Sequence, residues 1–307
     1  MRFPLLEAAF LCYNLCDCGS SAVIWRMNMF RYSVVCALEE MPRGNPTLLF
    51  GEPDELAHKL TILGANAVEL EISDPFRFDA SEVKRAFMRE LISVAAISTD
   101  LEYTKNGICL IEQNYIKRRE HIEKLKGHID FAQKLNCPVS IGMVRGMLPT
   151  AGDDYEIDRA VECFTESLCD LCDYAASKGV KIYLQALLRY LSNYLNSAGE
   201  TISYAKSLGI SNLGVSLDTH SMLMEEKDLA HELFLYAASI DHIRFSEGNR
   251  LCLGHGNVDF KKAMSALIDG GYDGYIGISA LPYPDGMECA RRSINYLRAL
   301  ESSLGPI

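Results

Sequence analysis

The feature that most limits the fold of this chain is a regular alternation of short β-rich runs and longer amphipathic segments after residue 30. Eight runs recur at intervals of roughly 25–45 residues, which is typical of strands joined in parallel through helices. They are residues 32–38, 67–73, 92–99, 138–144, 181–187, 213–219, 242–247 and 275–281.

The segments between these runs carry helical patterns. Residues 115–135 repeat apolar side chains at helical spacing, and 52–64 and 259–271 end at glycine, a common helix stop. Alternating strands and helices predict a parallel sheet, and eight units fit a (β/α)₈ TIM barrel better than an open sheet. No GxGxxG follows the first run, which argues against a dinucleotide-binding fold. Residues 99–114 are expected to form the longest loop, across the barrel mouth.

No Pro-, Gly- or Ser-rich linker divides the chain, so we expect residues 30–307 to form a single barrel domain. Residues 1–29 contain an apolar stretch interrupted by Glu7 and lack a small-residue cleavage site, unlike a signal peptide. They are expected to be a poorly ordered extension or the result of a misplaced start, with Met27 or Met29 as the true first residue.

The net charge and the cysteine pattern limit which partners the protein can bind and which cellular compartment suits it. The net charge of −11 is unfavourable for binding nucleic acid or anionic membrane, and no run of 18 apolar residues predicts a membrane span. Eleven scattered cysteines do not form a disulfide framework. Cys169 and Cys172 form a CxxC within a helical pattern, where small buried residues are more common than a metal or redox site. We expect a reducing cytoplasm.

Polar side chains collect where the predicted strands end, which is where TIM barrels place their active sites. They follow at least five of the eight strands, and such convergence favours a small polar ligand. The candidates are Glu69, Glu71, Asp74, Arg145, Gln185, Arg189, Tyr190, Asn193, Asp218, His220, Glu225, Glu226, His242, Arg244, Glu247, Asn249, Arg250 and His255. Glu225 and Glu226 are equally suited to the start of a helix.

Six stretches resemble one family. AVELEISDP, SIGMVRG, LRYLSNYLN, SLDTHSMLMEE, HIRFSEGNRLCLGHGNVDF and GYDGYIGI occur in this order between residues 31 and 303. Together they resemble the xylose isomerase-like TIM barrels of the sugar phosphate isomerase/epimerase group, which includes ketose 3-epimerases. The resemblance implies a divalent metal (Mn²⁺, Mg²⁺ or Zn²⁺) held by four side chains, and a proton shuttle beside a ketose carbonyl.

The chain departs from that pattern at most metal positions. Asp218 matches the ligand of the sixth strand, but Gln185, Arg244 and Ala280 replace the Glu, His and Glu of the other three. A guanidinium is always cationic and repels a metal ion. We therefore expect Arg244 to occupy the place of the metal, supply its positive charge and pair with Asp218. The resemblance then predicts an absent or weak metal site and loss of the usual proton shuttle.

Other acid–base sets remain open. Glu69 or Glu71, His220, Glu247 and His255 are candidates, although His220 stands one place before the family histidine, on what we expect to be the opposite face of the strand. Substrate binding is assigned to Asp218, Arg244 and Gln185 with four further residues. These are Arg145, Asn193, Arg250 and His255.

Two functions fit these departures. The first is an enzyme of carbohydrate metabolism, an isomerase or epimerase acting on a ketose, inosose or related sugar without the usual metal. The second is a non-catalytic sugar-binding protein or partner subunit. The ligand would be a sugar or sugar phosphate, and the resemblance implies a possible homo-oligomer or a related subunit. A repair endonuclease, also known among such barrels, is disfavoured by the acidic charge.

Overall fold

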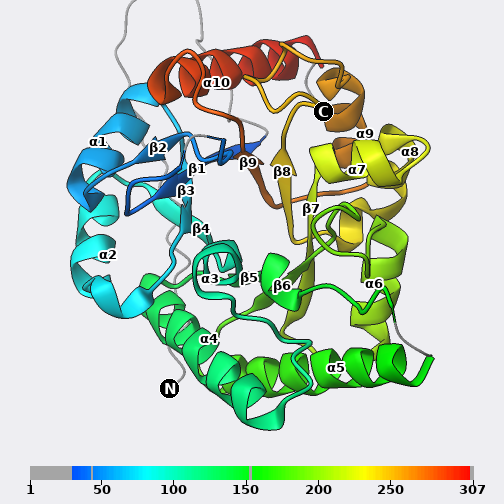
Figure 1. The fold of residues 1–307 in the computed structure, drawn as a ribbon. Helices are drawn as coiled ribbons and strands as arrows, with labels where there is room; N and C mark the ends of the chain where they lie inside the picture. Colours follow the sequence, from blue (N-terminus) through cyan, green and yellow to red (C-terminus); the bar gives the residue numbers. More distant parts are fainter. Residues whose placement is uncertain (1–29, 43, 152–153, 305–307) are drawn as a thin grey trace, which may run out of the picture.

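A closed ring of eight parallel strands forms the centre of the molecule (Figure 1), in a computed structural model that describes residues 30–42, 44–151 and 154–304. Each strand pairs with the next, and the first pairs with the last. The strands are β1 (Arg31–Ala37), β3 (Ala67–Glu71), β4 (Ser93–Ser98), β5 (Val139–Ile141), β6 (Ile182–Gln185), β7 (Leu213–Asp218), β8 (His242–Phe245) and β9 (Tyr275–Ile278). The predicted TIM barrel is confirmed.

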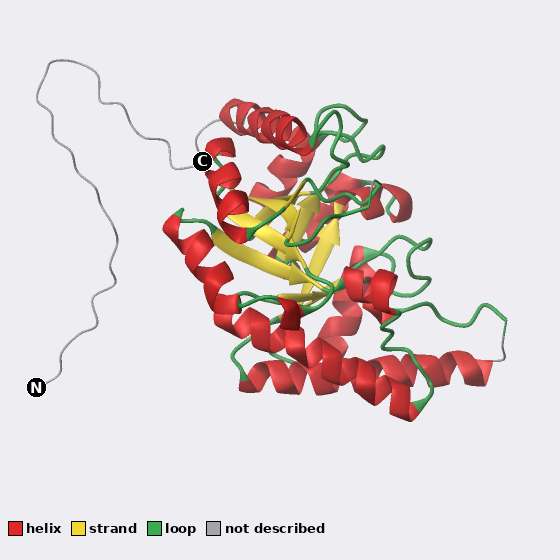
Figure 2. Ribbon diagram, turned by 60° about the vertical axis from the view of Figure 1, so that its left-hand side comes forward, coloured by secondary structure: helices red, strands yellow, loops and turns green. Residues whose placement is uncertain are grey.

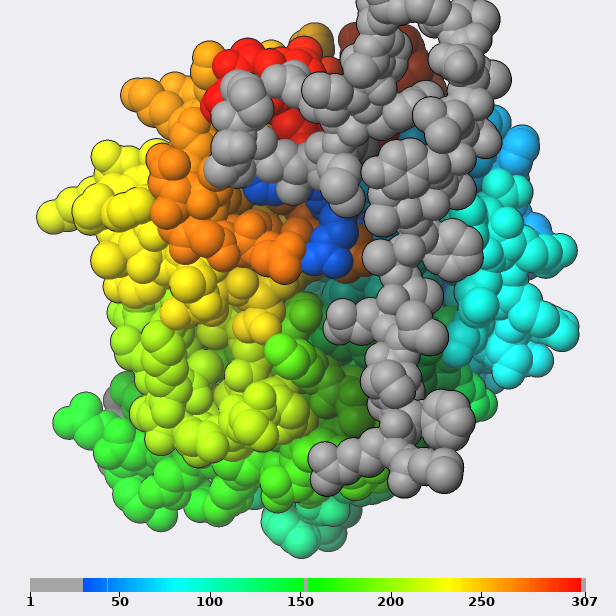
Figure 3. Space-filling view, turned by 180° about the vertical axis from the view of Figure 1, so that it is seen from behind, coloured from blue at the N-terminus to red at the C-terminus, as the bar shows by residue number. Residues whose placement is uncertain are grey.

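The barrel closes where β1 meets β9. Arg31 pairs with Tyr275 and Val34 with Ile278, and the short strand β2 (Leu49–Phe50) then pairs with the last residues of β1. Figure 3 views the molecule from behind, where the start of β1 (blue) lies against the segment near residue 270 (orange). That face therefore carries the beginnings of the strands, and the strands end on the face seen in Figure 1.

Helices surround the strands as an outer shell (Figure 2). They are α1 (Pro53–Leu63), α2 (Ala80–Arg89), α3 (Asp100–Asn106), α4 (Tyr115–Leu135), α5 (Asp154–Ser177), α6 (Ala198–Ser207), α7 (Thr219–Glu225), α8 (Leu229–Tyr236), α9 (Phe260–Asp269) and α10 (Gly286–Ser303), with short 3₁₀ turns at Pro75–Arg77, Met143–Arg145 and Ala237–Ser239. No helix in the described part of the chain is long and apolar enough to cross a membrane.

The helix ends follow from local sequence. Asn114 caps α4 by accepting a hydrogen bond from the Lys117 backbone, and Asn136 ends it in the left-handed conformation, so the predicted bounds 115–135 are confirmed. The expectation that residues 99–114 form one long loop is wrong. They contain α3, which ends at Gly107 with φ 68° and brings three of its residues to the barrel mouth.

Two further expectations from the sequence concern the N-terminal extension and the CxxC pair of cysteines. The proposed extension, residues 1–29, lies outside the described residues, so it stays a prediction. Cys169 and Cys172 lie in α5; Cys172 is buried, Cys169 is partly exposed, and the eight cysteines of the described ranges are all free thiols.

The inner face of the barrel is polar toward the strand ends. Register places Asp218 beside Arg244 and Arg244 beside Gly277. A Cβ at residue 277 would lie 3.0 Å from Glu69 Oε2 and 3.4 Å from Arg244 Cγ. The glycine therefore leaves the space in which two large charged side chains pack inside the barrel.

Candidate active site at the barrel mouth

A cavity of about 350 Å³ opens at the ends of the strands. Its polar lining includes Glu71, Asp100, Gln185, Asp218, Arg244 and Arg250. Leucines contribute much of its apolar lining, at positions 101, 187, 188, 191 and 281. A mixed lining of this kind, with several convergent polar groups, is typical of a site for a small ligand.

Arg244 lies in this cavity, and the carboxylate of Glu69 binds its guanidinium group. Its Nε donates to Glu69 Oε1 at 2.9 Å and its Nη2 donates to the same oxygen at 2.5 Å. Both side chains are buried, with 8% and 1% of their surface exposed. Burial alone would raise the pKa of Glu69, but Arg244 and His242 bring it below its usual range. Glu69 therefore stays ionised and fixes the guanidinium.

The partner of Arg244 differs from our expectation. Asp218 was expected to bind it, but the structure pairs Asp218 with Arg250, whose Nη1 donates to Oδ2 at 3.0 Å. Asp218 Oδ1 accepts the His220 backbone N–H at 2.8 Å. Arg250 adopts φ 58°, an unfavourable value for a residue other than glycine, and lines the cavity. Strained backbone of this kind is concentrated at functional sites.

Two further carboxyl groups face the cavity without an arginine of their own. Glu71 Oε2 accepts a hydrogen bond from Thr47 Oγ1 at 2.6 Å, and Asp100 Oδ1 accepts one from the Met143 backbone at 2.6 Å. Burial raises the pKa of Glu71 to about 7, against the opposing effect of Arg244. Burial also raises the pKa of Asp100. These are the carboxyl groups of the mouth that hold a proton most readily.

Gln185 presents an unused acceptor to the same cavity. Its Oε1 is buried and has no hydrogen-bond partner among the described residues. The carbonyl group and Asp100 converge on Gly142, where a Cβ would lie 2.8 Å from Gln185 Oε1 and 2.4 Å from Asp100 Oδ1. A buried acceptor without a donor is costly unless a ligand or water supplies one. A ligand hydroxyl would satisfy it.

His220 also lines the cavity, contrary to the argument from strand alternation. We expected the strand to include Thr219, but β7 ends at Asp218 and α7 begins at the next residue. The helical backbone turns the His220 ring toward the mouth, where Nδ1 lies 3.1 Å from the Glu247 carbonyl oxygen. Burial and the neighbouring Arg250 lower its pKa, which favours the neutral ring.

Besides Glu69, four of the residues predicted for catalysis or substrate binding lie outside the cavity lining. Arg145 is fully buried and donates to Ser192 Oγ and the Gln185 carbonyl, and burial lowers its pKa to about 10. Asn193 makes two hydrogen bonds with the Leu148 backbone. Both connect the loops that follow β5 and β6. Their contacts support the mouth instead of facing a ligand.

The other two, Glu247 and His255, belong to the loop after β8. Glu247 is fully buried, and its carboxylate accepts from the backbones of Gly254 at 2.8 Å and Val258 at 3.1 Å. His255 is exposed, and its carbonyl accepts from Asn249. Glu247 therefore organises the glycine-bracketed loop, and the structure does not bring either side chain to the cavity.

The residues at the mouth do not fit a divalent metal. Asp218 uses one oxygen for Arg250 and the other for a backbone N–H, and a guanidinium stands beside it. Gln185 offers one neutral oxygen, whereas a hard cation needs several charged or polar ligands. Among residues 30–42, 44–151 and 154–304, no group of three or more His, Cys, Asp or Glu side chains is arranged to hold a metal ion.

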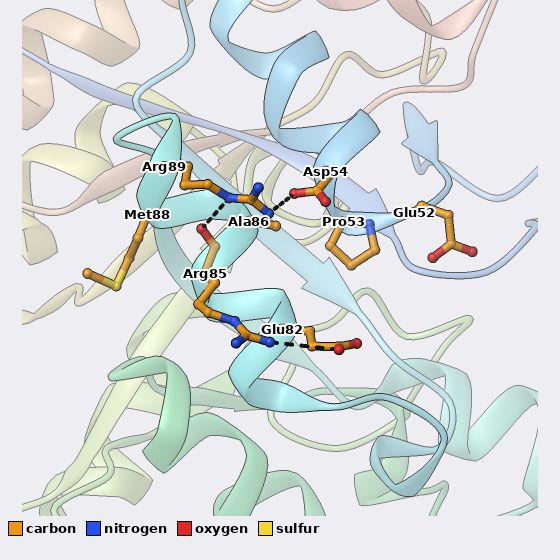
Figure 4. Close-up of a pocket in the computed structure, with 8 residues that line it drawn as sticks. All are labelled: Glu52, Pro53, Asp54, Glu82, Arg85, Ala86, Met88 and Arg89. Carbon is orange, nitrogen blue, oxygen red and sulfur yellow. Dashed lines mark hydrogen bonds and ion pairs between the residues drawn. The ribbon is translucent and has the colours of Figure 1, made fainter.

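A larger hollow, about 760 Å³, lies on the outer surface between α1 and α2 (Figure 4). Its charged residues already pair with one another: Arg89 Nη2 donates to Asp54 at 2.6 Å, and Arg85 lies 3.7 Å from Glu82. These pairs are exposed, so they contribute little energy. The hollow is larger than the cavity at the barrel mouth, but its charged groups already have partners. The barrel mouth therefore remains the candidate ligand-binding site.

Fold and site together define a TIM barrel with a polar, ligand-sized mouth. The family model described as xylose isomerase-like TIM barrel matches residues 58–300, and the chain belongs to this family. An L-ribulose 3-epimerase of Methylomonas sp. (strain DH-1) is 34% identical over 69% of this chain and 73% of that protein. A ketose 3-epimerase of Arthrobacter globiformis is 27% identical over 69% of this chain and 71% of that protein.

Solved structures agree on the fold. An L-ribulose 3-epimerase structure covers 90% of this chain and 95% of its own, with a TM-score of 0.74 and 20% identity. A D-psicose 3-epimerase with D-tagatose, from Clostridium cellulolyticum H10, covers 89% and 99%, with a TM-score of 0.74 and 16% identity. These likenesses show the fold, and the sequence relatives support membership of the sugar isomerase/epimerase group of the family.

Sequence reasoning missed two polar groups of the site, Asp100 and Thr47. Asp100 directly follows the run predicted as the third strand, so the rule that function collects at strand ends would have identified it. Thr47 lies in the segment between β1 and β2, where no pattern marks it. Its role depends on a contact with Glu71, 24 residues away in sequence.

Proposed function

We propose that the barrel mouth binds a neutral ketose or a related sugar, and that it does so without a divalent metal. The observation that carries this proposal is Arg244, held by Glu69 and facing the cavity at the place where the family resemblance would put a metal ligand. Its guanidinium is a fixed positive group that hydrogen-bonds to a carbonyl or hydroxyl oxygen.

The lining supports a polyhydroxylated ligand. Arg244 and Arg250 supply donors, while Gln185, Asp100 and Glu71 supply acceptors, so hydroxyl groups find partners of both kinds. The leucines contact the carbon skeleton of the sugar. Four carboxyl groups, three of them buried and one half-buried, stand against two arginines, which disfavours a phosphate dianion. These carboxyl groups belong to Glu69, Glu71, Asp100 and Asp218.

In this proposal the barrel mouth does not carry the metal-dependent proton shuttle that is typical of the family, because the residues for it are missing. Gln185 and Ala280 replace the two carboxylates, and an amide or a methyl group does not transfer protons at neutral pH. The names of the relatives support a ketose as the ligand class. A homo-oligomer, or a complex with a related subunit, stays a prediction.

The test is ligand binding measured by thermal shift and calorimetry on protein treated with EDTA. L-Ribulose, D-psicose, D-tagatose and D-fructose are the probes, each with and without Mn²⁺, and phosphorylated forms serve for comparison. We expect at least one neutral sugar to stabilise the protein, equally with and without Mn²⁺. A Gln185→Leu variant should lose affinity, and Glu82→Gln on the outer surface should retain it.

Two results would refute the proposal. One is the absence of binding by all four sugars. The other is binding that appears only when Mn²⁺ is added, or stoichiometric divalent metal found by elemental analysis of the purified protein.

A further inference from the structure

Glu71 and Asp100 are the two carboxyl groups of the cavity that neither an arginine pair nor the family resemblance explains, and Glu71 lies at the end of a barrel strand. We propose that Glu71 removes and returns a proton at the carbon next to the carbonyl of the bound sugar, while Arg244 holds the carbonyl oxygen. The site would then be a metal-free enolisation centre. This inference rests on the sugar site proposed above, and it adds chemistry that binding alone does not require.

The position of the Glu71 carboxyl group is well defined. Glu71 is the last residue of β3 and is 4% exposed, and Thr47 Oγ1 holds its Oε2 at 2.6 Å. A proton-transfer group must be held within reach of the carbon it serves, and this hydrogen bond restrains one oxygen of the carboxyl group. The charged and titratable groups around it are Arg244, Asp100, Glu69 and Cys36.

Arg244 is oriented to serve as the partner of this group. Its Nε and Nη2 bind Glu69, so that pair does not use Nη1. The guanidinium is planar, and fixing one edge sets the direction of the remaining N–H groups. A preorganised cation beside a carbonyl oxygen stabilises the negative charge that develops when the neighbouring C–H bond is broken.

Glu71 has the protonation behaviour that the reaction needs. Burial raises the pKa of its carboxyl group to about 7, while Arg244 and Thr47 act in the opposite direction. Near neutral pH the ionised form accepts a proton and the protonated form returns one. Glu69, by contrast, is held in its ionised form by Arg244 and has no such freedom.

The step balances with these residues alone. The Glu71 carboxylate takes the proton, the C–H electron pair becomes the second C–C bond, and the carbonyl π pair moves onto oxygen, which accepts from Arg244. The protonated Glu71 exchanges its hydrogen with water through the open mouth. It then returns a hydrogen to carbon as the electron pairs move back. In D₂O, one turn of this cycle replaces a C–H by a C–D bond.

The experiment follows that replacement by ¹H NMR in D₂O with EDTA, using the full chain and the four sugars named above. We expect loss of a proton signal next to the carbonyl, faster at higher pD through the neutral range. Glu71→Gln should reduce the rate about 100-fold or more while the dissociation constant stays within a few-fold. The matched control, Glu82→Gln, should exchange like the unmodified protein.

Thr47→Val provides a second variant with a different signature. It removes a hydrogen bond that favours the ionised form of Glu71, so the pH profile of exchange should move to higher pH. A purely structural role for Thr47 would lower binding or stability without moving the profile.

The outcomes separate the two proposals. Sugar binding without exchange above the protein-free rate would overturn the role of Glu71 and leave a non-catalytic sugar-binding protein. Exchange by Glu71→Gln at the unmodified rate, or exchange that requires added Mn²⁺, would also overturn it. Absence of binding by all four sugars would refute both proposals.

Discussion

The buried carboxyl group of Glu71 makes a prediction about stability that needs no ligand. In an unfolded chain this group ionises near its usual pKa of 4.5, whereas in the folded protein the pKa is about 7. Below the lower pKa both states hold the proton. As the pH rises through this range, the unfolded state releases its proton first, so the folded state loses stability between about pH 4.5 and pH 7.

The expected size follows from the two pKa values. Each pKa unit corresponds to about 1.4 kcal/mol, so a difference of about 2.5 units corresponds to roughly 3 kcal/mol. Glutamine has the same shape, still accepts from Thr47 and does not titrate. Relative to the unmodified protein, Glu71→Gln should therefore gain about 3 kcal/mol in free energy of unfolding between about pH 4 and pH 8.

Urea unfolding at the two pH values measures this gain. Far-ultraviolet circular dichroism is the suitable probe, because it follows the loss of the helices that surround the barrel. The control is Glu82→Gln, whose exposed side chain should give the same difference at both pH values. An unchanged difference for Glu71→Gln would show that Glu71 ionises normally, and the reasoning about its burial would be wrong.

Three other predictions concern the contacts of the mouth and its loop. Arg244→Met should destabilise the protein by about 3–5 kcal/mol because it leaves buried Glu69 unpaired, and adding Glu69→Gln should restore most of that loss in a double-mutant cycle of urea unfolding. Arg250→Ala should weaken sugar binding about 10-fold or more by calorimetry, while His255→Ala should bind normally because its side chain lies outside the cavity. Glu247→Gln should cost about 1–3 kcal/mol in unfolding free energy, since its amide group would face two backbone donors. The assignments would be contradicted if Arg250→Ala and His255→Ala changed the affinity equally, or if the double variant were no more stable than Arg244→Met. They would also be contradicted if Glu247→Gln left the free energy of unfolding unchanged.

The architecture was readable from the sequence because each barrel unit carries its own periodic pattern. The eight predicted runs correspond to eight strands, and α4 has the bounds predicted from its apolar spacing, with an asparagine as the cap at each end. The helix α3 was missed because seven residues give too few turns for helical periodicity to show. Its buried apolar residue, Leu101, belongs to a small core cluster and also lines the cavity.

The site was only partly readable, because its contacts join distant strands. Period-two alternation places Arg244 inside the barrel, but four carboxyl groups lie near it there, and sequence spacing does not choose among them. The observed partner, Glu69, is 175 residues away in sequence. His220 was misplaced for a local reason: strand alternation applies only as far as Asp218, where the chain changes to helix.

The exchange of a divalent ion for an arginine, which the family resemblance suggests, has an electrostatic consequence. A guanidinium brings one positive charge where a divalent ion brings two, and Glu69 compensates that single charge directly. Glu71 and Asp100 are then left in a buried site with too little positive charge, and burial raises the pKa of both. Arg244 still lowers the pKa of Glu71, so its removal should raise that pKa further. In the proposed site, Arg244 and the carboxyl group that holds a proton near neutral pH are thus parts of one arrangement, and a change in Arg244 should appear in the titration of Glu71.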